Sequence, residues 1–108
     1  MKARWISIPA AGLMIMCAGT AMADEALAKK SGCLECHSVD QKGIGPAFHD
    51  IAAKYKNNAR ARSALIETVK KGGKGNWTNV TGGVLMPPSS PRLSDAEIQR
   101  LIDWVLSL

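Results

Sequence analysis

Aromatic side chains are scarce in this chain of 108 residues, especially once its first 23 residues are set aside. Beyond that segment the aromatic residues are Phe48, Tyr55, Trp77 and Trp104. A domain of this size is marginally stable unless a disulfide, a metal or another core-filling group supports it. The thin set of large apolar side chains therefore favours a large apolar cofactor as part of the core.

The chain also lacks an apolar run long enough to span a membrane. The run over residues 6–18 covers about 13 residues, whereas a spanning helix needs about 20. Basic residues precede this run and Ala21-Met22-Ala23 follows it, which is the order typical of a secretory signal peptide. We therefore expect cleavage after Ala23, export to the periplasm, and a mature domain over residues 24–108 without a membrane span.

Cysteine and charge are both modest in the predicted mature chain. Cys17 falls in the signal segment, where lipidation is the alternative, although Met14 and Met16 fit a lipidation motif poorly. Lys2 and Arg4 also fall there, so 12 basic residues remain against 9 acidic ones and the net charge drops from +5 to +3. This balance does not point to nucleic acid as a partner.

No segment alternates convincingly between polar and apolar residues, so we expect an all-α domain of about four helices. The clearest begins after Ser94, where Ser94 and Glu97 have the spacing of a capping box and an apolar face follows. The other predicted helices cover residues 25–31, 47–55 and 61–71, with Gly32 ending the first. Residues 72–93 form a long loop rich in glycine and proline, and wrapping a ligand would account for its length.

Cys33, Cys36 and His37 form a Cys-x-x-Cys-His pattern, which is typical of c-type haem attachment. Two thiols at this spacing can bond to both vinyl groups of one porphyrin, and the next residue then lies under the iron. Three alternatives are weaker. A zinc site would need His49 and a fourth ligand that the sequence does not supply at the usual spacing. A thioredoxin-type pair would need a βαβ context, and a plain disulfide would leave the long loop unexplained.

A second axial ligand is expected if the iron transfers electrons. Met86 is the only methionine of the predicted mature chain. Pro87 follows it, and a residue before proline favours extended geometry, which suits a side chain presented from a loop. Filling a gap in the core is the ordinary alternative role for a methionine. His49 is the alternative sixth ligand and would give a bis-histidine haem.

The chain resembles the small bacterial class I monohaem cytochromes c. The resemblance rests on Cys-x-x-Cys-His at 33–37, Gly-Pro at 45–46, Gly-Asn-Trp at 75–77, Met-Pro-Pro at 86–88 and the helix around Trp104. It implies helices wrapped around one covalent haem c, with the first and last helices crossing. It implies thioether bonds at Cys33 and Cys36 and iron ligands at His37 and Met86. It also implies a hydrogen bond from His37 to the Pro46 carbonyl and a propionate contact for Trp77.

On this basis we expect a monomeric one-electron carrier, and not an enzyme, that passes electrons between periplasmic or membrane redox proteins in respiration. The alternative is a dedicated haem c subunit of an exported dehydrogenase or oxidoreductase. A ligand-binding or peroxidatic haem protein would require Met86 to stay away from the iron. Docking to redox partners should be weak and electrostatic. The candidate lysines for it are Lys42, Lys70, Lys71 and Lys74.

Overall fold

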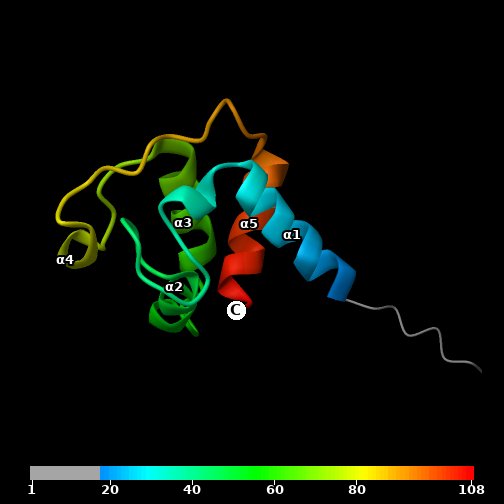
Figure 1. Ribbon diagram of the computed structural model, residues 1–108, viewed down its shortest axis with the longest axis horizontal. Helices are drawn as coiled ribbons and strands as arrows, with labels where there is room; N and C mark the ends of the chain where they lie inside the picture. The colour runs from blue at the N-terminus through cyan, green and yellow to red at the C-terminus, as the bar shows by residue number, and fades with distance from the viewer. Residues whose placement is uncertain (1–17) are drawn as a thin grey trace, which may run out of the picture.

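The computed structural model describes residues 18–108, which contain five α-helices and one 3₁₀ turn (Figure 1). In chain order they are α1 Ala18–Lys30, the 3₁₀ turn Cys33–Glu35, α2 Phe48–Lys54, α3 Ala61–Lys71, α4 Thr78–Thr81 and α5 Asp95–Leu106. These residues form no strand, and one isolated antiparallel bridge joins Gly73 to Met86. The predicted all-α class is confirmed.

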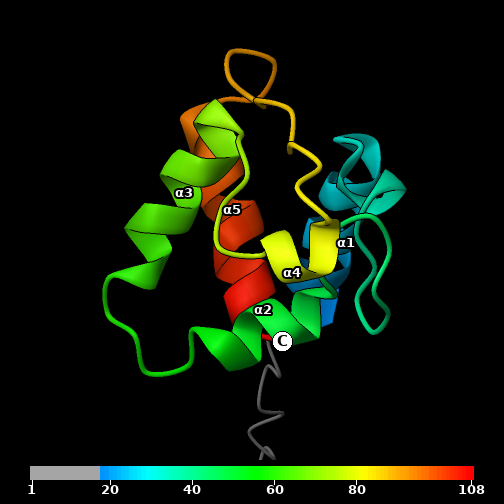
Figure 2. The ribbon, with the colours of Figure 1, turned by 90° about the vertical axis from the view of Figure 1, so that its left-hand side faces the viewer.

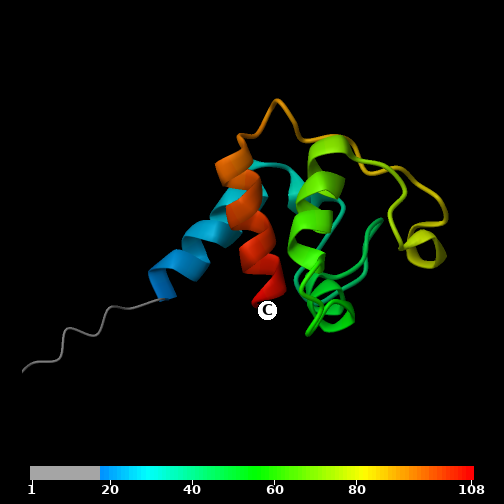
Figure 3. The ribbon, with the colours of Figure 1, turned by 180° about the vertical axis from the view of Figure 1, so that it is seen from behind.

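Helix α5 is the element around which the others pack. It contacts α1, α2 and α3, and Figures 2 and 3 show it between α1 and α3. Its apolar face was predicted to hold Ile98, Leu101, Ile102, Val105 and Leu106; the first four are buried, Leu106 is only partly buried, and Trp104 is buried beside them. Burying one large apolar side chain contributes roughly 1.5–3 kcal/mol, so this face is a main source of stability for the domain.

The start of α5 is fixed by the predicted capping box. The Ser94 hydroxyl accepts a hydrogen bond from the Glu97 N–H, and the Ser94 N–H donates to Glu97 Oε1, both at 3.1 Å. Two N–H groups at the start of the helix, which have no partner within it, are satisfied in this way. Hydrogen bonding of the carboxylate by the Ser94 backbone N–H, and secondarily by the Ser94 side chain, lowers the pKa of Glu97, and the charges of Lys30 and Arg100 add to this.

Helix α1 is longer than predicted, because it starts at Ala18 and not at Glu25. It ends near the predicted position, and Gly32 follows with the positive φ of 83° that favours glycine. Ala28 is fully buried in the core cluster that also holds Trp104. The Asp24 carboxylate binds Arg100 of α5 at 2.8 Å, so the predicted mature N-terminus is tied to the core.

The predicted signal peptide lies largely outside the described residues, and its cleavage stays a prediction. Within residues 18–108 no helix is long and apolar enough to cross a bilayer.

The segment 72–93 is a long loop, as predicted, but it contains a short helix and a backbone bridge that the sequence did not indicate. Four of its residues form α4, although threonine, asparagine and valine are weak helix formers and gave no sequence signal. Its base is closed by two hydrogen bonds of 2.9 Å between the backbones of Gly73 and Met86. Gly72 is required beside this base, because a Cβ there would lie 2.8 Å from the Pro88 nitrogen.

The capping box predicts a pH dependence of stability. Because folding lowers the pKa of Glu97, its contribution is fully present above the ordinary glutamate pKa and is lost as the pH falls through the lowered folded value. Glu97→Gln keeps an acceptor for the Ser94 N–H but does not titrate. Urea unfolding should show that the wild type loses more stability than this variant between about pH 6 and pH 3. An equal loss in both proteins would contradict the assignment.

Candidate functional site

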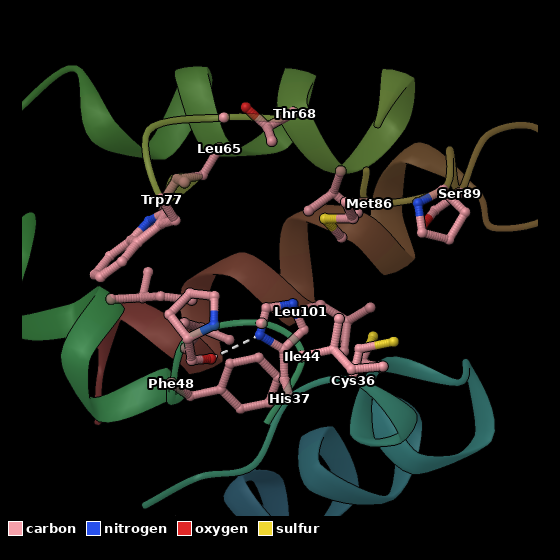
Figure 4. A pocket seen from close by; sticks show the side chains of 18 of the residues that line it. Cys36, His37, Ile44, Phe48, Leu65, Thr68, Trp77, Met86, Ser89 and Leu101 are labelled. Atoms are coloured by element: carbon pink, nitrogen blue, oxygen red, sulfur yellow. Dashed lines mark hydrogen bonds between the residues drawn. The ribbon is translucent and has the colours of Figure 1, made fainter. Parts of the chain in front are cut away.

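One apolar cavity brings together the residues that the sequence singled out (Figure 4). Its walls come from the 33–48 segment, α3, the 73–89 segment and α5. The predicted site residues on its wall are Cys33, Cys36, His37, Pro46, Trp77 and Met86. Residues more than fifty positions apart in the sequence therefore face one space.

The imidazole of His37 is held in one orientation. Its Nδ1–H donates to the Pro46 carbonyl at 2.7 Å, and the ring stacks on Phe48 with centroids 5.1 Å apart. Gly45 lies so close that a Cβ there would come within 2.5 Å of the imidazole Cε1. Figure 4 shows the second ring nitrogen turned toward the cavity, on the side of Met86. This nitrogen is therefore free to bind a metal inside the cavity.

Met86 enters the cavity from the wall opposite His37. Its sulfur points into the space in Figure 4, toward the imidazole. The backbone of Met86 is fixed by the paired hydrogen bonds to Gly73, and Ser89 just beyond donates its N–H to the Val69 carbonyl of α3 at 2.9 Å. The thioether is thus presented from an anchored part of the loop.

Cys33 begins the 3₁₀ turn and Cys36 directly follows it; both are free thiols and line the cavity. The turn is closed by hydrogen bonds from the N–H groups of Cys36 and His37 to the Cys33 carbonyl, at 3.3 and 3.0 Å. Burial raises the pKa of the Cys33 thiol, and the positive charge of Arg92 opposes part of that rise. The two sulfurs and the imidazole therefore come from one short, rigid segment.

Trp77 is half-buried on the cavity wall, and its position depends on α2. The Lys54 ammonium lies 4.3 Å from the centroid of the Trp77 ring and donates to the Asn76 carbonyl at 2.9 Å. A cation over an indole face is a favourable contact. This link ties the far end of the 72–84 segment to α2, while the propionate contact of Trp77 stays a prediction.

His49 lies outside the cavity, which speaks against a bis-histidine iron. It is exposed on α2, and its Nδ1 lies 2.5 Å from the Asp40 carboxylate. The zinc alternative also finds no support, since within residues 18–108 no three His, Cys, Asp or Glu side chains gather as a metal site.

Sequence reasoning missed two residues of the site. Phe48 was recognised only as one of few aromatics, although it forms the surface on which the imidazole stacks. Arg92 lines the cavity near Cys33, and no motif marked it. The Gly45-Pro46 pair in the sequence indicated the hydrogen-bond partner of His37, whereas no sequence pattern indicated Arg92.

The chain belongs to the cytochrome c family, which it matches over residues 23–108. It is 46% identical over 91 residues to cytochrome c-551 of Allochromatium vinosum, covering 84% of this chain and 92% of that protein. It is 43% identical over 108 residues to cytochrome c-552 of Nitrosomonas europaea, covering 100% of this chain and 99% of that protein. The crystal structure of wild-type Nitrosomonas europaea cytochrome c552 matches with a TM-score of 0.69 at 43% identity, covering 78% of this chain and 98% of that one.

Within the family, the chain is a small class I monohaem cytochrome c, a haem-based electron carrier with one covalently bound c-type haem. The cavity fits this group on three counts. Its walls are largely apolar, as a porphyrin ring requires, and two free thiols share one edge. A nitrogen and a thioether sulfur face each other across it (Figure 4).

Because Gly45 lies so close to His37, we expect a larger residue at position 45 to disturb the site. Gly45→Ala would place a methyl group 2.5 Å from the imidazole Cε1, so the ring or its loop must shift. We expect the haem-loaded variant to lose roughly 1–3 kcal/mol of stability, the range for overpacking, and to show an altered visible spectrum. Lys42→Ala is the control, because Lys42 is exposed in the same loop and absent from the cavity wall. A Gly45→Ala protein that matches the control in both measurements would contradict this geometry.

Proposed function

We propose that this chain is an exported one-electron carrier whose haem is bonded to Cys33 and Cys36 and ligated by His37 and Met86. The observation that carries the proposal is the meeting of these four side chains in one cavity. It is supported by the covalent haem of the family and by the match over 92% and 99% of the length of two relatives.

The protein's part in the chemistry is to fix both ligands and keep water away. The haem iron supplies a reversible one-electron couple. The Pro46 carbonyl accepts the Nδ1–H of His37, so the tautomer of the neutral ring that it favours has its lone pair on the other nitrogen, oriented as a ligand. The soft thioether of Met86 favours the reduced state more than a second imidazole would, so it raises the potential.

Two ligands from the chain leave no open position for a substrate, which favours a carrier over an enzyme. The same chemistry would serve a dedicated haem subunit of an exported dehydrogenase, with a permanent partner in place of a transient one. If the native protein, purified from its own cells, elutes as a monomer, this result would support the free carrier. Co-elution with a larger enzyme would support the subunit.

Electrons would pass where apolar side chains surround the cavity rim. Ile44, Val84 and Leu85 are each more than half exposed and line the cavity, so they suit a transient contact. Of the candidate docking lysines, Lys70 and Lys71 pair with acidic residues: Lys70 with Asp95 at 3.4 Å and Lys71 with Glu67 at 3.2 Å. Lys42 and Lys74 have no ion pair within residues 18–108 and are the better candidates for steering.

The predicted signal segment would place this carrier in the periplasm, between a reductase and an oxidase of a respiratory chain. Its modest positive charge and small apolar rim suit brief encounters of a monomer with acidic partner surfaces.

Loss of the thioether should be visible directly. Met86→Ala should abolish the weak near-infrared band of methionine-ligated ferric haem, lower the reduction potential, and allow the reduced protein to bind carbon monoxide at neutral pH. Val80→Ala is the control, because Val80 lies in the same segment but not on the cavity wall. A near-infrared band that survives in Met86→Ala would rule out Met86 as the ligand.

The steering role of Lys74 can be tested with ferricyanide, an anionic inorganic oxidant. Lys74→Gln should slow oxidation of the reduced protein about two- to fivefold at low ionic strength, and the difference should vanish at high salt. Lys56→Gln removes an equal charge beyond the end of α2, off the cavity wall, and should have little effect. Equal rates in the two variants at low salt would contradict a local role for Lys74.

A further inference from the structure

The charged side chains on the cavity wall are of one sign. Among the described residues that line it, the charged groups are the ammonium of Lys74 and the guanidinium of Arg92, and no carboxylate is present. The Lys74 side chain makes no hydrogen bond or ion pair with the described part of the chain, so no such contact holds its ammonium group in one position. Arg92 differs, because its guanidinium is held in place.

Arg92 is bound to the backbone just before the haem-binding segment. Its Nη1 donates to the Ser31 carbonyl at 2.9 Å, across 61 positions of sequence. Ser31 is only 4% exposed and lies two residues before Cys33. Arg92 has no acidic partner among residues 18–108, so its positive charge is not cancelled locally.

This charge lies at the end of the cavity where the Cys33 segment begins. Arg92 and Cys33 both line the cavity, and the guanidinium is hydrogen-bonded to the carbonyl two residues before Cys33. The guanidinium therefore lies beside the segment through which, in the proposed function, the haem ring is attached.

We propose that Arg92 raises the reduction potential of this cytochrome by holding a fixed positive charge at the Cys33 edge of the haem site. The inference rests on the proposed function. Reduction brings one electron from a donor protein and leaves the haem site one unit more negative, with no bond made or broken. A nearby cation stabilises that added charge, so Arg92 favours the ferrous form. The guanidinium is exposed, and the effect is therefore moderated by solvent and salt.

The test compares the reduction potentials of three haem-loaded variants with that of the wild type. Arg92→Gln removes the charge, Arg92→Lys keeps it with a different donor, and Arg60→Gln removes an equal charge away from the cavity wall. At low ionic strength, Arg92→Gln should shift the ferrous-to-ferric ratio about three- to tenfold toward ferric at a fixed ambient potential, where tenfold equals about 59 mV. Arg92→Lys should restore most of the potential, and Arg60→Gln should leave it nearly unchanged.

Salt separates the charge from the hydrogen bond to Ser31. A charge effect should shrink as ionic strength rises, whereas a loosened backbone would lower the potential equally at all salt concentrations. An unchanged potential in Arg92→Gln, a Lys variant that falls as far as the Gln variant, or a salt-independent difference would each overturn the proposal. The near-infrared band is recorded for every protein. Its absence from the wild type would contradict the His37–Met86 ligation, while a normal band with an unresponsive potential would contradict the role of Arg92 alone.

Discussion

The hydrogen bond from His37 to the Pro46 carbonyl is the interaction on which the rest of the site depends. It decides which imidazole nitrogen carries the proton, and so which nitrogen faces Met86 across the cavity. The Gly45 backbone is packed against the same ring, so the imidazole can neither flip nor swing outward without moving the loop. If His37 is the iron ligand, as proposed, an imidazole held in this way would undergo little rearrangement when the charge of the iron changes, which suits fast electron transfer.

The orientation of His37 is coupled to the core through a short chain of rings. Phe48 stacks on the imidazole with an interplanar angle of 19°, and Trp104 of α5 meets Phe48 edge-on at 5.5 Å. The capping box and the apolar face of α5 therefore support the haem site as well as the fold. The opposite wall is anchored separately, by the Gly73–Met86 backbone bonds and by Lys54 over Trp77.

The sequence was informative where a local pattern has one physical solution. The capping box and apolar period of α5, the bounds of α3 and the glycine after α1 were all predictable, because spacing determines each of them. The stacking of Phe48 was not, because a contact between two separate segments decides it, and neither the early start of α1 nor the short α4 carried a local signal. Arg92 illustrates the same limit, since its contact with Ser31 joins two segments that no motif connects.

The central claim is that Cys33 and Cys36 attach one haem inside the cavity that His37 and Met86 face. The most direct test is the intact mass and colour of the predicted mature chain, produced in a host that matures c-type cytochromes. The account predicts a red protein heavier by one haem, and loss of that mass when both cysteines are replaced by alanine. A folded, colourless wild-type protein with two unmodified thiols would contradict it.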